Sequence, residues 1–269
     1  MNAHIKRWIT GIITVPILFL IIGYGSEDIF AALIIAVILT AYYEYNALVF
    51  NAAAIAQKWE GMVIAFLMAA AAFAGGVGLL LSVTTFSILG VFILFLFHIH
   101  KSHALDVNSL AKMILGLMYI PFMLSYFIFI RRVENGALWI FFILILAFCG
   151  DISAFYVGRT VGKRKLAAMV SPGKTVEGTL ALIAGSTAGC MLFKVLFFPL
   201  LPLEHAVVIG FVGSIIGQLG DLCESAIKRA SGVKDSGSIL MGHGGLLDRL
   251  DCLIFIVPFV YYYKVYFIR

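Results

Sequence analysis

The chain has 269 residues, of which 62% are hydrophobic and 12% are charged, and its mean hydropathy is +1.07. A water-soluble domain carries about 45–50% apolar and about 25% charged residues. This composition therefore excludes a single water-facing globule, and lipid must be the solvent for most of the surface. The formal net charge of +5 is modest, and we expect no nucleic-acid partner.

Apolar runs long enough to cross about 30 Å of hydrocarbon recur along the chain. They predict an all-α polytopic integral membrane protein with about nine transmembrane helices, because the alternation of a β-barrel is absent. The glycines at 75, 76 and 78 allow residues 61–100 to be divided differently. The expected helices cover residues 7–24, 29–50, 61–82, 84–100, 109–130, 137–157, 178–200, 205–227 and 247–267.

The distribution of Lys and Arg predicts a cytoplasmic N-terminus, with loops 158–177 and 228–246 on the same side of the membrane. Residues 1–140 are expected to form N-terminal transmembrane helices for packing and oligomer contacts. Residues 141–269 are expected to form the catalytic transmembrane region with its two cytoplasmic loops. The role of Glu44 stays open between an interfacial residue of an aromatic belt and a dimer or substrate contact.

A polar stripe marks the segment GQLGDLCESAIKR at 217–229. A carboxylate costs roughly 2.5–3.5 kcal/mol on insertion scales at the centre of a membrane helix. The stripe is therefore expected to face a hydrophilic cavity or a partner. Three- and four-residue spacing places its members on one helix face: Gln218, Asp221, Glu224, Ser225 and Lys228.

The segment HGGLLDRLD at 243–251 adds two carboxylates. Asp248 and Asp251 are expected on one face near the start of the ninth helix, after the flexible His243, Gly244 and Gly245. With Asp221 they converge from two helix ends joined by a short loop. Oxygen ligands without His or Cys suit Mg²⁺. The competing interpretation is a buried ion-pair network with Lys228, Arg229 and Arg249.

The loops beside these carboxylates are basic. Lys234 and Asp235 lie in a Gly- and Ser-rich loop that fits phosphate binding or a positive-inside tether. In the other loop, Lys163, Arg164 and Lys165 fit substrate binding and contact with anionic lipid equally well. Functional roles are favoured for the residues around it: Asp151, Ser171, Lys174, Thr175 and Glu177.

Two motif interpretations are rejected. The fragment GKT at 173–175 is no P-loop, because Ala168 stands where that motif needs glycine. Zinc binding by His243 is disfavoured, because His98, His100 and His103 are expected in a distant interfacial loop.

Segment 225–251, SAIKRASGVKDSGSILMGHGGLLDRLD, closely resembles the signature of the phosphatidate cytidylyltransferase (CDP-diglyceride synthase) family. The upstream element S-P-x-K-T-x-E-G at 171–178 and the Asp151 region are similar as well. Met241 departs from the family's usual proline or small residue. The positions that match the signature are Ser225, Lys228, Arg229, Lys234, Asp235, Gly237, His243, Gly244, Gly245, Asp248, Arg249 and Asp251.

The resemblance implies transfer of a cytidylyl group from CTP to phosphatidic acid, giving CDP-diacylglycerol and pyrophosphate. It implies Asp221, Asp248 and Asp251 as Mg²⁺ ligands, with a second cation left open, and Lys228 and Arg249 among the catalytic groups. CTP, phosphatidic acid and the bilayer are the expected partners, and a homodimer is left open. The expected location is the cell's inner membrane, with the active site facing the cytoplasm.

Four other activities compete with this interpretation. A CTP-dependent lipid kinase, or a cytidylyltransferase acting on an isoprenoid ether lipid, would use similar chemistry. A cation-coupled transporter would place its carboxylates at the midplane rather than at helix ends. A CDP-alcohol phosphotransferase is disfavoured, because its D-x-x-D-G-x-x-A-R core is absent.

Overall fold

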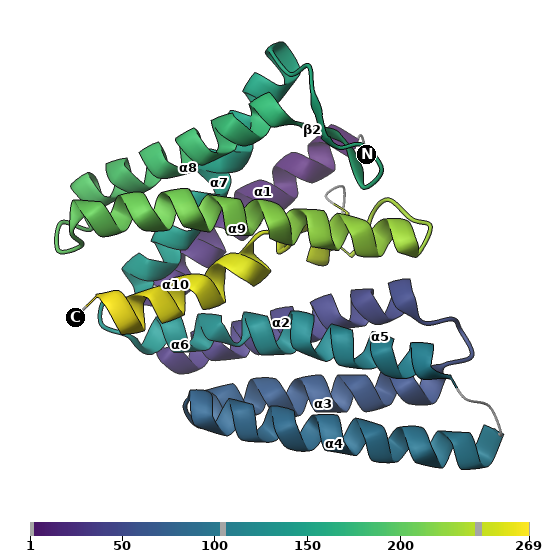
Figure 1. The fold of residues 1–269 in the computed structure, drawn as a ribbon. Helices are drawn as coiled ribbons and strands as arrows, with labels where there is room; N and C mark the ends of the chain where they lie inside the picture. The colour runs from purple at the N-terminus through teal and green to yellow at the C-terminus, as the bar shows by residue number, and fades with distance from the viewer. Residues whose placement is uncertain (1–2, 103–105, 240–243, 269) are drawn as a thin grey trace. The chain divides into compact units, whose positions relative to one another are not determined.

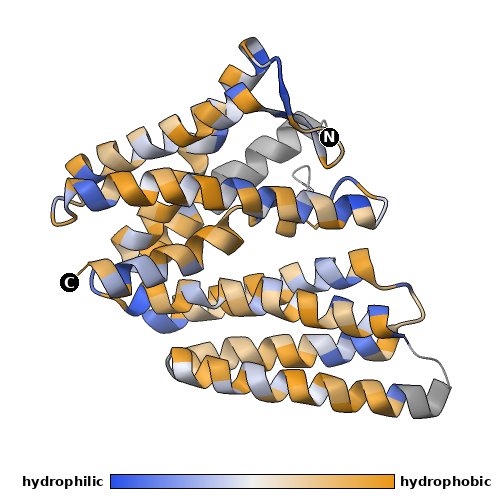
Figure 2. Cartoon of the chain, viewed as in Figure 1, coloured by the Kyte–Doolittle hydropathy of each residue, from blue (hydrophilic) through white to orange (hydrophobic). Residues whose placement is uncertain are grey.

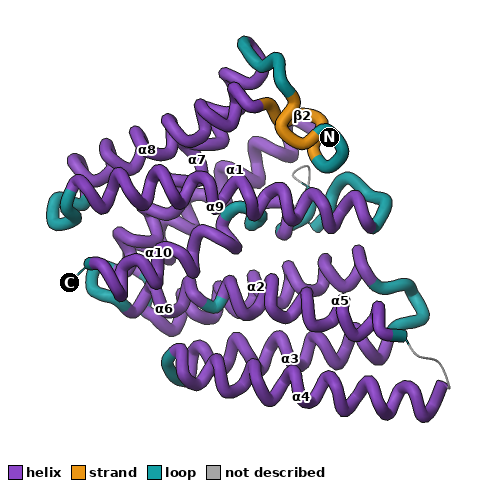
Figure 3. Tube along the Cα trace, in the orientation of Figure 1, coloured by secondary structure: helices purple, strands orange, loops and turns teal. Residues whose placement is uncertain are grey.

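A computed structural model describes residues 3–102, 106–239 and 244–268, and it describes side chains for residues 14–98 and for the last two of these ranges. Helices make up nearly all of the described chain (Figures 1 and 3). The predicted all-α class is therefore confirmed. The chain divides into two compact units.

The first unit contains Met1–Pro16, Gly25–Phe129 and Asp235–Leu247. Within it, α2 packs on α3 and α5, and α3 packs on α4. A π-helical segment, Met118–Phe122, follows α5 and contains Pro121. The elements are α1 (Ala3–Tyr24, which the division splits), α2 (Glu27–Val49), α3 (Ile55–Ala74), α4 (Val77–Ser102), α5 (Val107–Leu117) and α6 (Tyr126–Arg132, whose last residues belong to the second unit).

The second unit contains Ile17–Tyr24, Ile130–Lys234 and Asp248–Arg269. Helix α7 packs on α8, α8 on α9, and α9 on α10. The elements are α7 (Gly136–Thr160), β1 (Lys165–Ala167), β2 (Ser171–Thr175), α8 (Val176–Phe197), α9 (Leu203–Ala230) and α10 (Leu253–Phe267).

Within the described residues, seven helical segments are long and apolar enough to cross a membrane. The expected number of nine is not confirmed: Leu253–Phe267 is a shorter apolar helix, and α1 could be assessed only over Thr14–Tyr24, where its side chains are described. Large apolar side chains point away from the protein, as Phe86 (72% exposed) and Phe97 (67% exposed) do on α4. Such a surface is stable against lipid and costly against water. The chain is therefore a multi-pass membrane protein.

Three boundaries differ from the sequence-based expectation. The break expected between residues 82 and 84 falls at Gly75–Gly76, where the Gly75 N–H caps α3 by donating to the Ala71 carbonyl (3.0 Å). Loop 158–177 contains an antiparallel hairpin that pairs Lys165 with Thr175. The last helix begins at Leu253 rather than at 247, because residues 247–249 form a 3₁₀ turn.

Small residues let α7 and α8 approach closely. The Ser186 hydroxyl donates to the Leu146 carbonyl (2.7 Å). A Cβ added at Gly185 would stand 2.9 Å from the Cys149 carbonyl oxygen and would overlap Ser153. Small residues are the usual means of close helix packing in lipid, where no hydrophobic effect drives helices together. This packing fixes the two helices that flank the hairpin.

We expect Gly185→Ala to destabilise the protein by about 1–3 kcal/mol, because the added methyl group overfills the α7–α8 interface. Gly90→Ala on α4 is the matched control, since a Cβ there meets nothing within 4 Å. The control should be neutral or stabilising by up to about 1 kcal/mol. Thermal unfolding in detergent measures both. Equal melting temperatures for the two variants would contradict the packing assignment.

Candidate functional site

The polar stripe predicted on 217–229 is a buried face of α9. Glu224 is 1% exposed, Gln218 8%, Ser225 8% and Lys228 9%. The neighbouring Leu219 is 52% exposed, so the helix turns its apolar side outward and its charges inward. The prediction that these residues share one face directed into the protein is confirmed. Figure 2 shows hydrophilic residues gathered on the hairpin and at the C-terminal end of α9.

An ion pair joins the two segments that carry the motifs. The Lys174 Nζ lies 2.5 Å from Asp221 Oδ2. Lys174 stands near the end of β2, so the hairpin carries it to the middle of α9. The Ser225 hydroxyl donates to the same carboxylate (3.3 Å). Segments about 50 residues apart in sequence therefore meet at Asp221.

A second cation bridges two carboxylates. The Lys228 Nζ lies 2.5 Å from Glu224 Oε2 and 2.7 Å from Asp248 Oδ1. Its exposed side-chain fraction is 11%, so both pairs are largely shielded from solvent. A buried lysine is tolerated only when its charge is paired. Lys228 thus holds the 3₁₀ turn Leu247–Arg249 against α9.

The expectation that Asp248 and Asp251 share a helix face is wrong. Both precede α10, and Asp248 lies in the 3₁₀ turn. Asp251 lies within electrostatic range of Asp221 and Asp151, whereas Asp248 is bound by Lys228. The 3₁₀ turn ends at Arg249 and α10 begins at Leu253, so no continuous helix aligns the two side chains, although both lie within electrostatic range of Glu224.

A narrow cavity in the second unit is lined by Asp151, Asp221 and Gln218 together with apolar side chains of α7, α8 and α10. Asp151 lies within electrostatic range of Lys174 and Arg249 as well as Asp221. The Gln218 Nε2 is buried and has no hydrogen-bond partner among the described protein atoms. A buried amide donor normally has one. The cavity is therefore a polar site whose hydrogen bonding the described side chains leave incomplete.

Burial raises the pKa of the Asp251 carboxyl well above its usual range, and the nearby charges of Asp221 and Asp151 raise it further. The Cys252 N–H, which donates to Asp251 Oδ1 (2.7 Å), opposes this shift. Negatively charged side chains therefore dominate the electrostatic field at the Asp251 carboxyl. A bound cation would relieve the repulsion among them.

The proposed ligands fit a hard cation by chemistry, because all of them offer carboxylate oxygens. Among the described residues, no group of three or more Asp, Glu, His or Cys side chains stands in position to hold a metal ion. The ligand set of Asp221, Asp248 and Asp251 stays a prediction. The mutual proximity of Asp151, Asp221 and Asp251 makes Asp151 an additional candidate.

Three predicted substrate-binding residues build the hairpin and the start of the helix after it. The Thr175 hydroxyl accepts the Gly178 N–H (3.1 Å) and caps α8. Glu177 Oε2 accepts the N–H groups of Lys163 (3.0 Å) and Arg164 (3.2 Å). Ser171 begins β2 and pairs with Ala167. These contacts fix the hairpin that carries Lys174.

Arg229 connects the two basic loops. Its Nε donates to the Val170 carbonyl (3.2 Å) and its Nη1 to the Val233 carbonyl (2.6 Å). Arg229 thus joins Val170 of loop 158–177 to Val233 of loop 228–246, while the predicted side of the membrane stays a prediction. Six charged residues of the two motif regions are exposed: Lys163, Arg164, Lys165, Lys234, Asp235 and Arg249.

The glycine-rich segment before Asp248 is described from Gly244 onward, and the expectations for His243 and Met241 lie outside the described residues. Gly244 has φ +82°, a conformation that favours glycine. Gly245 is buried beside Ser236 and Glu44. Sequence reasoning left the role of Glu44 open, and the available signal was a carboxylate inside an apolar run.

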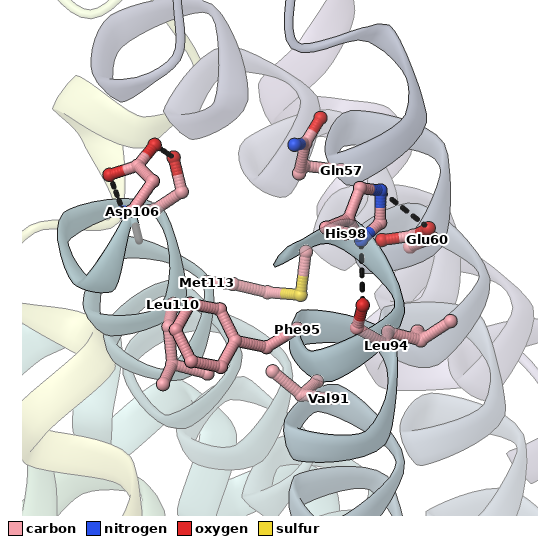
Figure 4. A pocket seen from close by; sticks show the side chains of 10 residues that line it. Gln57, Glu60, Val91, Leu94, Phe95, His98, Asp106, Leu110 and Met113 are labelled. Atoms are coloured by element: carbon pink, nitrogen blue, oxygen red, sulfur yellow. Dashed lines mark hydrogen bonds and ion pairs between the residues drawn. The ribbon is translucent and has the colours of Figure 1, made fainter. Parts of the chain in front are cut away.

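A separate cavity lies in the first unit (Figure 4), lined by Glu60, His98, Asp106 and apolar side chains of α4 and α5. His98 belongs to α4 rather than to the expected loop, and so does the backbone of His100, while His103 lies outside the described residues. The His98 Nδ1 donates to the Leu94 carbonyl (2.8 Å), and its Nε2 lies 3.6 Å from Glu60. None of the residues that match the signature lines this cavity.

The second unit thus defines a class of protein: a multi-pass membrane protein in which a hairpin lysine and the turn before the last helix each form an ion pair with a long helix, beside a small cavity that contains Asp151 and Asp221. The chain belongs to the cytidylyltransferase family, whose sequence profile matches residues 5–267.

Curated relatives agree with this membership. A phosphatidate cytidylyltransferase of Bacillus subtilis is 36% identical over 65% of this chain and 66% of its own length. An uncharacterized protein of Escherichia coli, YnbB, is 42% identical over 49% of this chain and 44% of its own length. A phosphatidate cytidylyltransferase of Staphylococcus epidermidis is 36% identical over 58% of this chain and 56% of its own length. The chain therefore matches less than two thirds of each relative.

We expect Lys228→Met to lower the free energy of unfolding by about 3–5 kcal/mol, because it leaves Glu224 and Asp248 buried without their cation. Lys194→Met on α8 is the matched control and should stay within about 1 kcal/mol of the wild type. Denaturant titration in mixed micelles measures both. Adding Glu224→Gln and Asp248→Asn to Lys228→Met should recover part of the loss, and a cost equal to that of the control would refute the bridge.

Asp251→Asn should stabilise the cation-free protein at high pH. The folded state holds the Asp251 proton more tightly than the unfolded state, so the free energy of unfolding falls as pH rises from about 4 through the raised folded pKa. The asparagine substitution removes this dependence and keeps an acceptor for the Cys252 N–H. Unfolding in EDTA should show wild type and variant alike near pH 4, and the variant more stable by about 1 kcal/mol or more at pH 8. A constant difference across pH would contradict the assignment.

Proposed function

We propose that this chain transfers the cytidylyl group of CTP to phosphatidic acid, giving CDP-diacylglycerol and pyrophosphate. Membership of the cytidylyltransferase family and the printed names of two relatives support this assignment. The ion pair between Lys174 and Asp221 is the main structural support for this assignment, because the pair joins the S-P-x-K-T element to the carboxylates of α9. Both substrates are anionic phosphates, and cations surround the carboxylates at this site.

In this reaction a phosphate oxygen of phosphatidic acid attacks the α-phosphorus of CTP, and the bond from that phosphorus to the bridging oxygen of the β-phosphate breaks. Pyrophosphate leaves with both electrons of that bond. The nucleophile is already ionised, so positioning and charge neutralisation contribute more than a general base. Lys174 and Arg249 are cations within electrostatic range of Asp151. Lys228 supports the site by holding Asp248.

Asp221 would hold Mg²⁺ together with Asp251 and Asp248, and a second cation remains an option within the proposal. A bound divalent cation would neutralise phosphate charge and orient the triphosphate. The protein's own residues then have separate tasks. Lys174 and Arg249 bind phosphate oxygens, and the buried Gln218 amide donates a hydrogen bond to a ligand in the cavity.

The proposed location is the cell's inner membrane, with the site facing the cytoplasm. The basic residues of the hairpin and of the segment after α9 support this orientation. The phosphatidic acid headgroup would enter the site while its acyl chains stay in lipid. A homodimer formed by the N-terminal helices belongs to the same proposal.

Purified protein with CTP, Mg²⁺ and phosphatidic acid should form CDP-diacylglycerol and pyrophosphate, identified by mass spectrometry of the lipid and a pyrophosphate assay. Asp221→Asn and Lys174→Met should each lower turnover by about 100-fold or more, because they remove charge from the reacting phosphates. Asp28→Asn, an exposed carboxylate at the start of α2, is the matched control and should keep wild-type turnover.

The products also separate the alternatives. Release of CDP with a phosphorylated lipid would indicate a kinase, and product formation only with an isoprenoid ether lipid would change the acceptor. Cation flux in proteoliposomes without CTP would indicate a transporter. Near-normal turnover of Asp221→Asn would contradict the catalytic site.

A further inference from the structure

Glu44 is a buried carboxylate on the apolar helix α2. It is 2% exposed, and Tyr42 and Tyr45 beside it are fully buried. It therefore does not lie at a solvent interface, as membership of an aromatic belt would require. Ionisable residues inside membrane helices are costly and usually functional. The contacts of this carboxylate show what it serves.

Three donors from one segment converge on Glu44. The Leu246 N–H donates to Oε1 (3.0 Å), and the Leu247 N–H donates to Oε2 (2.8 Å). The Ser236 hydroxyl also donates to Oε2 (3.2 Å). All three donors belong to Asp235–Leu247, which groups with α2 in the first unit. The Glu44 carboxylate thus forms hydrogen bonds with residues near both ends of this segment.

Glu44 lies so close to the backbone at positions 237 and 245 of the signature that a side chain larger than that of glycine would overlap neighbouring atoms. A Cβ at Gly237 would stand 2.7 Å from Glu44 Oε1, and its three nearest atoms all belong to Glu44. A Cβ at Gly245 would stand 2.7 Å from Glu44 Oε2 and would overlap the Ser236 hydroxyl. Heavy atoms this close would have to shift. The glycine at 237 is thus explained by a carboxylate about 200 residues earlier in the chain, and the glycine at 245 by the same carboxylate together with Ser236 and the Gly237 backbone.

We propose that Glu44 is a positioning residue for the reaction: it anchors Ser236 and the backbone at Leu246 and Leu247, and thereby sets the turn that presents Asp248. Leu247 and Asp248 are consecutive and share the 3₁₀ turn Leu247–Arg249. Fixing the Leu247 N–H therefore restricts the backbone that carries Asp248. The catalytic consequence rests on the proposed function, whereas the anchoring itself does not.

Glu44→Gln is the sharpest single change, because it keeps the shape and removes one acceptor. In either orientation of the new amide, a backbone N–H of Leu246 or Leu247 faces an NH₂ donor. We expect kcat to fall about tenfold or more and the KM for CTP to change less than about threefold, because Glu44 touches no substrate. Glu60→Gln, the same change at a carboxylate of α3, is the matched control and should keep wild-type kcat.

A double-mutant cycle separates anchoring from general stability. Gly237→Ala should lower kcat in the wild-type background, because its methyl group meets Glu44. In the Glu44→Ala background the same change should cost less than about twofold, because the obstructing side chain is gone. Independent costs of the two changes would overturn the proposal.

Hydrogen exchange gives a readout without turnover. The amides of Leu246 and Leu247 should exchange faster in Glu44→Gln than in Glu60→Gln, while α2 keeps its protection. Equal exchange in the two variants would overturn the anchoring. If Glu44→Gln does not fold, exchange at the same amides in Gly237→Ala, measured with and without Glu44→Ala, decides the question.

Failure of the proposed function has a different signature. Wild-type protein would then form no CDP-diacylglycerol, although the Leu246 and Leu247 amides would still respond to Glu44→Gln. Normal wild-type turnover together with unchanged kcat in both Glu44→Gln and Gly237→Ala would overturn the positioning role alone.

Discussion

Charge compensation inside an apolar fold constrains the second unit. Helix α9 buries Glu224 almost completely and carries Asp221 on the same face. An uncompensated carboxylate in such surroundings costs several kcal/mol, so each needs a cation at close range. Lys228 supplies one from the same helix, and Lys174 supplies the other from the hairpin. The position of the hairpin and that of the turn before α10 both follow from this requirement.

Under the proposed function, the same pairs would also prepare the site for its substrates. In the ligand-free site, the lysines neutralise the carboxylates. Once a divalent cation binds the carboxylates, the same lysines would be available to bind phosphate. The raised pKa of Asp251 reflects the excess negative charge that such a cation would relieve. The unpaired Gln218 amide is consistent with a site completed by a ligand.

Sequence periodicity predicted the all-α class and the buried face of α9, because both depend on local patterns of apolar and polar residues. It did not predict two features that depend on tertiary contacts. One is the short hairpin, and the other is the 3₁₀ turn before α10, where Asp248 pairs with Lys228 and Asp251 lies near Asp221. A helix start at 247 was expected because the apolar run that predicts the last helix begins there.

Glu44 shows a different limit of sequence reasoning. Its partners include two backbone N–H groups, which every non-proline residue carries, so no side-chain pattern around 246 points to it. The sequence shows a carboxylate in an apolar helix and glycines at 237 and 245. Only the folded structure shows that these residues are in contact. If a signature glycine is required by a carboxylate of α2, then the N-terminal helices contribute more than packing. They hold part of the backbone on which the signature's aspartate depends, so the catalytic region cannot be defined by the C-terminal half alone.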